Sequence, residues 1–409
     1  MNILVTGSAG FLGRNLCENL KCIRDGKNRT RPNMKITNIY EYDQGSTQEQ
    51  LDRYCQDADF IVHAAGINRP KETNEFMEGN FGFTSVLLDT LNKHHNRAPI
   101  IVTSSIQATL SGRFGNSEYG RSKLAGEKLM FEYGEQTGTP VYIYRFPNLV
   151  GKWVKPNYNS AVGTFCNAVA NDLPFTVNDR NTEMELLFIE DLLEELYDCM
   201  EGHPHRCDYP KEGENGWDGV TPKKSVNGPY CYCPITHKAA LGVIVDLLEK
   251  FKEHQNTLIP PNFTPGCLEK KLYSMYLSYL PPEKTIYDLH MNIDERGSFT
   301  ELLHTPFSGQ VSVNITKPGV TKGQHWHNMK AEEFIVVSGH GLIRERNLLN
   351  GEIREYEVKG EKVQSVIMLP GFTHSITNIG EDDLVTIITC NEVFDKNHPD
   401  TFFEPIIDE

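Results

Sequence analysis

The sequence predicts an α/β domain built on a parallel sheet, followed in the same chain by a smaller all-β domain. The chain has 409 residues, enough for two or three domains of about 150 residues each. Up to about residue 145, short β-branched runs alternate with helical patterns, which is typical of βαβ units. After Pro282 the helical patterns stop, and short alternating runs separated by turn residues follow.

The first domain is predicted to cover residues 1–280. Its strands are expected at 3–5, 36–42, 60–63, 100–103 and 141–144, with helices beginning at Phe11, Thr47, Asn74 and Ser117. Residues 146–280 are less regular, with helical stretches near 189–201, 237–254 and 267–278, and we assign them mainly to a substrate-binding subdomain. The proline pair Pro281-Pro282 sets the predicted domain boundary.

Residues 281–409 form the predicted all-β domain. Its strands are expected at 310–316, 333–338, 341–346, 363–368 and 384–389. Short strands at this spacing predict a barrel or a sandwich.

Composition limits the partners of the protein. The 40 Lys+Arg and 55 Asp+Glu residues give a formal net charge of −15, which argues against nucleic acid. No run approaches the ~18 apolar residues of a membrane span, and the N-terminus does not read as a signal peptide. The ten scattered cysteines are expected to be reduced thiols of a cytoplasmic enzyme.

A glycine-rich turn between the first strand and the first helix predicts a dinucleotide site. The spacing of Gly7, Gly10 and Gly13 allows a tight turn, close approach to a pyrophosphate, and packing of helix on strand. This setting makes the α/β domain a Rossmann-type, doubly wound sheet. The candidate cofactor residues of the turn are Gly7, Gly10, Phe11, Leu12, Gly13 and Arg14.

A Tyr/Lys pair follows on the helix after the fourth strand. Tyr119 and Lys123 are four residues apart, so both lie on one helix face, and the ammonium is expected to lower the pKa of the phenol. Such a phenol can give a proton to a carbonyl oxygen as hydride reaches the carbon. Ser105 is expected to orient that oxygen, with Ser104 as the alternative.

These motifs resemble the extended short-chain dehydrogenase/reductase family over positions 1–280. Arg145-x-x-Asn148-x-x-Gly151 matches a further segment of that family. The resemblance implies cofactor contacts from Ala64, Ala65, Gly66 and Asn80.

The choice of nicotinamide cofactor rests on opposing residues. Asp43 at the end of the second strand would accept from a ribose 2′-hydroxyl and favour NADH. Arg14, Arg29 and Arg31 could pair with a 2′-phosphate. We predict NADPH, with NADH as the alternative.

The substrate is expected to be a nucleotide sugar. Dehydratases of the family carry an acid pair after the serine, but Ser105 is followed by Ile106-Gln107, which favours a reductase or a 4-epimerase. Asn148, Lys152 and Arg180 are the candidate substrate ligands, the last two for a diphosphate.

The all-β domain carries a histidine motif that resembles the metal-binding cupins. Gly319-x5-His325-x-His327-x4-Glu332-x6-Gly339 has the spacing of the first cupin motif, and Gly371-x2-His374-x3-Asn378 is a weaker form of the second. Three imidazoles and a carboxylate suit one divalent metal, zinc first, with iron, nickel or manganese as alternatives. The candidate ligands are His325, His327, Glu332 and His374.

The order of reductase and cupin resembles the bifunctional CapF-type enzymes of capsular polysaccharide synthesis over nearly the whole chain. The resemblance implies C3 epimerisation of a UDP-2-acetamido-2,6-dideoxy-hexos-4-ulose, with Lys322 and His325 at the basic positions. NADPH reduction at C4 then gives UDP-2-acetamido-2,6-dideoxy-L-talose, on the way to UDP-N-acetyl-L-fucosamine. The family also implies a homodimer.

Two rival functions remain, an NAD-dependent 4-epimerase that returns the hydride, and a non-catalytic cofactor-sensing scaffold. Residues 203–237 match no part of the family that we can place. Cys207, Cys231, Cys233 and His237 lie there, but Cys-x-Cys lacks the usual gap of a zinc site.

Overall fold

The computed structural model describes residues 1–67, 75–305 and 309–407. The chain packs into two compact units, one formed by 1–248 with 264–280 and the other by 249–263 with 281–409. The domain boundary between 280 and 281 stays a prediction, and the helix start predicted at Asn74 lies outside the described residues. Within the described ranges, no helix combines the length and the apolar character needed to cross a membrane.

The first unit is built on a mainly parallel sheet with the strand order β2-β1-β3-β4-β5-β10-β8-β9. Because β2 and β3 lie on opposite sides of β1, the ends of β1 and β3 form the switch point at which doubly wound sheets bind ligands. The predicted Rossmann-type fold is therefore confirmed. Five neighbouring strands run parallel, from the edge strand β2 inwards: β2 (Asn38–Tyr42), β1 (Asn2–Thr6), β3 (Phe60–His63), β4 (Ile100–Ser105) and β5 (Val141–Phe146).

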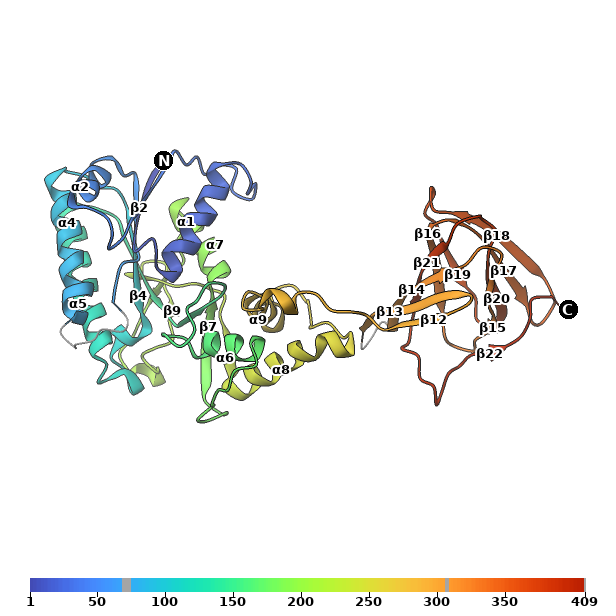
Figure 1. Ribbon diagram of the computed structural model, residues 1–409. Helices are drawn as coiled ribbons and strands as arrows, with labels where there is room; N and C mark the ends of the chain where they lie inside the picture. Colours follow the sequence, from blue (N-terminus) through green and yellow to red (C-terminus); the bar gives the residue numbers. More distant parts are fainter. Residues whose placement is uncertain (68–74, 306–308, 408–409) are drawn as a thin grey trace. The chain divides into compact units, whose positions relative to one another are not determined.

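Helices cover both faces of this sheet (Figure 1). On one face, α2 (Gln48–Asp57), α4 (Phe83–Lys93) and α5 (Glu118–Thr137) bury Leu51, Leu87, Leu91 and Met130 against the strands. On the other, α1 (Phe11–Arg24) and α7 (Ile189–Met200) bury Leu16, Leu20, Leu192 and Leu196. Two helix starts follow from local capping, because the Thr47 and Ser117 side chains accept the amides of Gln50 and Gly120.

The segment 203–237 extends the sheet, which the sequence did not predict. Its strands are β8 (Arg206–Asp208), β9 (Lys223–Lys224) and β10 (Tyr230–Cys231), and β10 runs parallel to β5. Strands of two or three residues are too short to produce a readable alternation. Cys207 and Cys231 are fully buried in this edge of the sheet.

The segment predicted to form the substrate-binding subdomain, residues 146–280, contains a small second sheet with the order β11-β7-β6. The helix predicted from residue 237 is wrong in its first turn, because His237–Ala240 pairs with β7 as a strand and the helix begins at Leu241. The elements are β6 (Asn148–Val150), β7 (Glu183–Phe188), β11 (His237–Ala240), α6 (Ala161–Ala170), α8 (Leu241–Thr257) and α9 (Leu268–Leu277), of which α8 belongs to the first unit only up to Leu248.

The second unit contains an all-β barrel of two antiparallel sheets, which confirms the predicted cupin fold. One sheet has the order β12 (Met291–Asp294), β13 (Gly297–Thr305), β14 (Gly309–Thr316), β21 (Leu384–Cys390), β16 (Glu332–Ser338), β19 (Ser365–Met368). The other has the order β18 (Ile353–Lys359), β17 (His340–Asn347), β20 (Phe372–Asn378), β15 (Thr321–Trp326), β22 (Phe402–Phe403). Strand β20 buries the four successive residues Thr373, His374, Ser375 and Ile376, three of them polar, so both of its faces are covered and it shows no apolar alternation.

His63 at the end of β3 makes the stability of the first unit depend on pH. Its ring nitrogens lie 2.8 Å from the Thr6 hydroxyl and 2.9 Å from the Thr84 hydroxyl. Burial lowers the pKa of His63 to about 3, helped by the nearby charge of Lys123. Below pH 6.5 the unfolded chain therefore binds a proton that the folded chain does not.

We predict that His63 lowers the free energy of unfolding by up to about 1.4 kcal/mol per pH unit as the pH falls from 6.5 towards 3. Urea unfolding of the wild type and of His63→Gln between pH 4.5 and 7.5 measures this slope. The variant should be less stable at pH 7 and should show a shallower loss on acidification, and equal slopes would contradict the assignment.

Candidate functional site

The turn after β1 needs glycine at both of its ends. Gly7 has a φ of +71°, and a Cβ there would lie 2.7 Å from the Ala65 nitrogen. A Cβ on Gly13 would lie 2.1 Å from the Gly7 carbonyl oxygen. The first turn of α1 therefore packs directly against the end of β1, and its free amides face the space where a pyrophosphate binds in this fold.

A cavity of about 520 Å³ joins this turn to the Tyr/Lys pair. Most of the predicted reductase residues line it, which brings together positions up to 141 residues apart in sequence. The predicted residues that line it are Gly7, Gly10, Phe11, Leu12, Gly13, Arg14, Ala64, Gly66, Ser105, Tyr119, Lys123 and Asn148. Asp43, Ala65, Asn80, Lys152 and Arg180 are not among the lining residues.

Tyr119 and Lys123 lie together on the first turns of α5. The Lys123 ammonium is 5.9 Å from the centre of the Tyr119 ring and donates to the Thr103 carbonyl oxygen at 3.1 Å. Desolvation lowers the pKa of Lys123 to about 8, while the nearby Glu127 carboxylate opposes this shift. The expected lowering of the Tyr119 pKa is wrong, because burial raises the pKa of this phenol. The phenol therefore stays protonated at neutral pH, as a proton donor must.

Ser105 and Ser104 differ in what their hydroxyls do. Ser104 is buried and donates to a Glu127 carboxylate oxygen at 2.5 Å. The Ser105 hydroxyl accepts the Gln107 amide at 3.2 Å, so its proton remains available to an oxygen in the cavity. The geometry favours Ser105 over Ser104 as the orienting group.

Asn80 supports the site from behind the cavity. Its amide donates to the Ser122 hydroxyl at 3.0 Å and to the Ile67 carbonyl oxygen at 3.1 Å, and its oxygen accepts the Ile67 amide. These bonds join the loop after β3 to α5. A Cβ on Gly66 would lie 2.6 Å from Asn80 Oδ1 and 2.9 Å from the Lys123 ammonium, so a side chain there would require these two groups to shift.

A buried ion pair beneath the site was missed by the sequence analysis. Both Glu127 oxygens accept from Arg145, at 2.9 and 2.6 Å, and both side chains are almost fully buried. The Arg145 guanidinium also lies 4.1 Å from the centre of the Tyr230 ring and 4.9 Å from that of Tyr209. The segment 203–237 thus supplies aromatic cover for Arg145.

The candidate diphosphate ligands, Lys152 and Arg180, do not line the cavity. Lys152 is paired with Glu190 at 2.9 Å, and Arg180 with Asp246 at 2.6 Å. Residues that the sequence analysis did not select line the cavity instead, among them the cation Lys155 and the aromatic Tyr158. Selecting Lys155 would have required knowing which way the loop after Gly151 turns.

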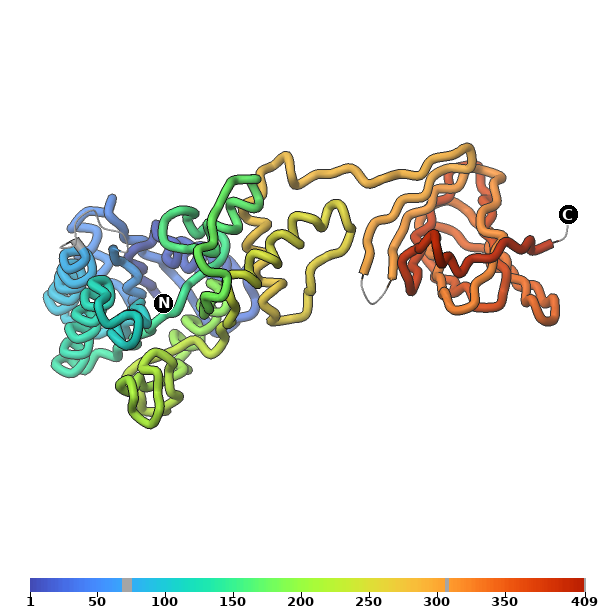
Figure 2. The backbone as a smooth tube through the Cα atoms, turned by 90° about the horizontal axis from the view of Figure 1, so that it is seen from below, coloured from blue at the N-terminus to red at the C-terminus, as the bar shows by residue number. Residues whose placement is uncertain are grey.

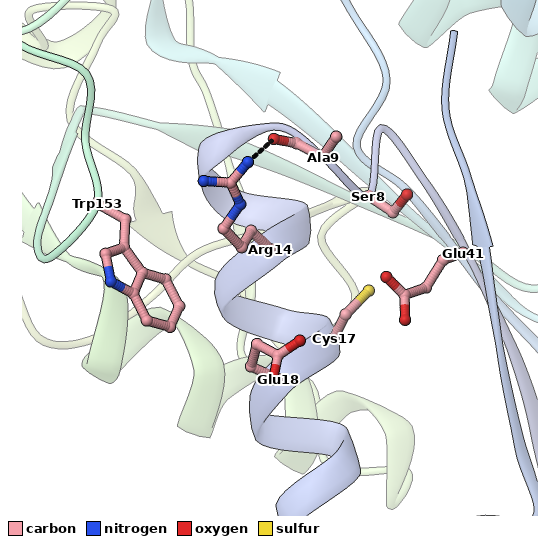
Figure 3. A pocket seen from close by; sticks show the side chains of 7 residues that line it. All are labelled: Ser8, Ala9, Arg14, Cys17, Glu18, Glu41 and Trp153. Carbon is pink, nitrogen blue, oxygen red and sulfur yellow. Dashed lines mark hydrogen bonds between the residues drawn. The ribbon is translucent and has the colours of Figure 1, made fainter. Parts of the chain in front are cut away.

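A second, smaller pocket of about 430 Å³ lies beside the glycine turn (Figure 3). In it the Arg14 guanidinium donates to the Ala9 carbonyl oxygen at 3.4 Å, and the described residues give Arg14 no carboxylate partner. Asp43 lies next to the pocket, and its carboxylate accepts the amides of Ala9 and Gln44 at 2.7 and 2.8 Å. The residues shown in Figure 3 are Ser8, Ala9, Arg14, Cys17, Glu18, Glu41 and Trp153.

Arg31 is not available to a cofactor phosphate, contrary to the prediction. Its guanidinium pairs with carboxylates of α7 and of the residue after it, at 2.5, 2.5 and 2.9 Å. The three partners are Glu194, Asp198 and Glu201. A sequence that places Arg31 in a basic loop does not reveal that this loop packs on an acidic helix.

In the barrel, the four candidate metal ligands come together. One nitrogen or oxygen of each lies within 4.8 Å of the others. His325 is directly opposite His374 in the pairing of β15 with β20, and Glu332 begins β16. The four residues are His325, His327, Glu332 and His374.

The donor set fits a divalent cation. His327 Nε2 and both His374 nitrogens are buried with no hydrogen-bond partner, which is costly for polar atoms. The Nε2 atoms of His327 and His374 lie 3.5 and 3.3 Å from the same Glu332 oxygen. In the part of the chain that the structure describes, no cysteine joins such a cluster, and the thiols of 203–237 form no second zinc site.

Lys322 lies on the same strand as His325. Its ammonium donates to Asn314 Oδ1 at 2.9 Å and to the Ile315 carbonyl oxygen at 2.8 Å. Burial lowers the pKa of Lys322.

Known proteins resemble the chain over its full length. Residues 3–204 match the NAD dependent epimerase/dehydratase family, and residues 292–402 match the Polysaccharide biosynthesis C-terminal domain. The chain is 37% identical over 402 residues to UDP-2-acetamido-2,6-beta-L-arabino-hexul-4-ose reductase of Pseudomonas aeruginosa, with 98% of each chain covered. It is 43% identical to the capsular polysaccharide assembling protein CapF of Staphylococcus aureus, with a TM-score of 0.85 over 99% of this chain and 100% of that one. A structure of CapF with the inhibitor 3-isopropenyl-tropolone gives a TM-score of 0.80 at 40% identity, over 99% of this chain and 100% of that one.

The fold and the two sites define an extended short-chain dehydrogenase/reductase joined to a cupin. The chain belongs to the CapF-type family of such proteins.

We predict that Glu127→Gln destabilises the first unit by about 3 kcal/mol, because it leaves the Arg145 charge buried without its partner. Urea unfolding measures the change. Glu132→Gln is the matched control, since Glu132 lies exposed on the same helix and should change stability by less than about 0.5 kcal/mol. A similar effect of both substitutions would mean that the ion pair contributes nothing specific.

Proposed function

We propose that the chain is a bifunctional nucleotide-sugar enzyme. The cupin epimerises a UDP-2-acetamido-2,6-dideoxy-hexos-4-ulose at C3, and the N-terminal domain then reduces C4 with NADPH to UDP-2-acetamido-2,6-dideoxy-L-talose. This product leads to UDP-N-acetyl-L-fucosamine for capsular or surface polysaccharide. The observation that carries the proposal is that one chain holds both a Tyr/Lys/Ser cavity beside a dinucleotide turn and a separate histidine-carboxylate cluster. The similarity to the Pseudomonas aeruginosa UDP-2-acetamido-2,6-beta-L-arabino-hexul-4-ose reductase supports this choice of sugar.

In the reduction, Tyr119 gives its proton to the C4 oxygen while hydride from the nicotinamide reaches C4. The raised pKa of Tyr119 keeps the donor protonated before transfer, and the Lys123 ammonium stabilises the phenolate afterwards. Ser105 orients the carbonyl oxygen with its free hydroxyl proton.

In the epimerisation, Lys322 takes the proton from one face of C3, and the resulting enolate receives a solvent-derived proton on the opposite face, with His325 as the neighbouring basic group. The C4 ketone acidifies this proton, and the lowered pKa of Lys322 increases the share of neutral amine. His325, His327, Glu332 and His374 would hold a divalent cation, zinc first, which supplies a Lewis acid for the developing negative charge. Because reduction removes the ketone, epimerisation comes first.

Tyr119→Phe tests this division of labour. The variant should lose NADPH oxidation by at least about 100-fold, because it lacks the proton donor, yet keep deuterium exchange at the sugar C3. Incubation with the UDP-4-ketosugar in deuterated water, followed by absorbance at the NADPH band and by NMR at C3, reads both steps.

Lys322→Met is the complementary variant and should lose C3 exchange. Loss of both activities in Tyr119→Phe would contradict the assignment of separate sites. A wild type that interconverts C4 epimers without net NADPH consumption would instead identify the rival 4-epimerase.

NADPH is the proposed reductant, and Arg14 the cation for its 2′-phosphate. Arg14 lacks a carboxylate partner among the described residues, whereas the Asp43 carboxylate is already bound to two backbone amides. Arg14→Gln should raise KM for NADPH by about tenfold or more and leave KM for NADH nearly unchanged.

Arg29→Gln is the matched control, since Arg29 is an exposed arginine outside the pocket. An equal effect of Arg14→Gln on both cofactors, or a wild type that prefers NADH, would assign the ribose contact to Asp43 instead. The homodimer implied by the family stays a prediction.

A further inference from the structure

The C-terminal segment of the chain returns to the metal-ligand cluster. Strand β22 (Phe402–Phe403) pairs with β15, placing Phe403 opposite His325 and Phe402 opposite Trp326 (red in Figure 2). Asp400 precedes this strand and has a φ of +36°, in the left-handed region that few residues adopt. A non-glycine residue in that conformation calls for compensating contacts.

Asp400 contacts one candidate ligand with its backbone. Its carbonyl oxygen accepts a hydrogen bond from His327 Nδ1 at 2.6 Å. A carbonyl oxygen can only accept hydrogen bonds, so this contact places the imidazole proton on Nδ1. In the neutral ring His327 Nε2 then carries a lone pair that can bind a cation. That nitrogen is the one that lies 3.5 Å from Glu332 and has no hydrogen-bond partner.

The Asp400 carboxylate binds the turn that joins two of the ligands. Its Oδ1 accepts the backbone and side-chain amides of Asn328 at 3.0 and 3.1 Å. Its Oδ2 accepts the backbone amides of Met329 and Lys330 at 2.9 and 3.0 Å. Residues 328–330 lie between His327 and Glu332, so one carboxylate sets the path of the chain from the second ligand to the third.

This turn also places the buried side chain of Lys330 beside the cluster. The Lys330 ammonium lies 3.5 Å from Glu332 Oε1, and its side chain is buried over the Phe394 ring. The other oxygen, Oε2, faces His327 and His374. Fixing the Lys330 backbone therefore helps to decide which carboxylate oxygen faces the imidazoles.

We propose that Asp400 is a positioning residue of the metal site, fixing both the tautomer of His327 and the turn from His327 to Glu332. The inference rests on the metal site of the proposed function. Groups that orient metal ligands in this way typically change metal affinity by 10–100-fold when removed. Asp400 itself is not one of the four clustered ligands.

The test measures zinc affinity of the full-length protein by competition with a chromophoric chelator, and the visible spectrum of the cobalt-substituted protein. Asp400→Ala should weaken zinc binding by about 10–100-fold and alter the cobalt bands, because the ligand geometry relaxes. The zinc affinity of Asp400→Asn should lie between that of the wild type and that of Asp400→Ala. Asparagine retains one acceptor oxygen and tolerates the left-handed conformation.

Asp395→Ala is the matched control. Asp395 lies in the same segment and its carboxylate accepts the Asn397 amide at 2.8 Å, but among the described residues that carboxylate contacts only Asn397 and His398. It should bind zinc as the wild type does.

Unchanged zinc affinity and an unchanged cobalt spectrum in Asp400→Ala would overturn the inference. If that variant does not fold, as thermal unfolding of the metal-free protein would show, the same criterion applies to Asp400→Asn. A wild type that binds neither metal would refute the proposed metal site instead, so the two failures are distinguishable.

Discussion

The backbone at Gly7 is approached so closely from two sides that no side chain fits there. The loop after β3 passes within 2.7 Å of where a Cβ would lie, and the first turn of α1 packs against the Gly7 carbonyl oxygen. This contact brings the ends of β1 and β3 together with the N-terminus of α1 at the switch point of the sheet. The cofactor cavity, the passage of Lys123 beside Gly66 and the support from Asn80 all depend on that junction.

The barrel is organised by a different constraint, the burial of polar groups. Three imidazoles and a carboxylate occupy its interior, and several of their nitrogens have no hydrogen-bond partner. Burying polar atoms in this way is unfavourable unless a hydrogen-bond partner or a bound cation compensates for the water that they have lost. The net charge of −15 of the whole chain adds a further requirement, since any anionic ligand must be held against the average field by local cationic or backbone N–H groups.

Short sequence patterns predicted those site residues whose arrangement depends on a single helix, turn or strand. Tyr119 and Lys123 share a helix face, and the glycine spacing follows from the turn it builds. His325 and His327 alternate along one segment, so spacing alone was enough to group them.

Tertiary packing determined what the sequence analysis missed. Arg31, Lys152 and Arg180 read as free cations, but each is bound to carboxylates distant in sequence. The Glu127–Arg145 pair and the sheet extension at 203–237 depend on contacts between segments with no periodic signal. The pKa of Tyr119 was mispredicted because burial outweighs the neighbouring ammonium, and burial is a property of the folded site.

Asp400 also has a bearing on the order of events during synthesis. It follows His374, the last of the four clustered ligands, by 26 residues, since 400 − 374 = 26. At translation rates of about 5–20 residues per second, roughly one to five seconds separate the two residues on the ribosome. A nascent chain therefore passes through an interval in which all four ligands exist but the turn from His327 to Glu332 is not yet held. The turn from His327 to Glu332 therefore reaches its final path only after the carboxyl-terminal segment has been made and has folded back onto it.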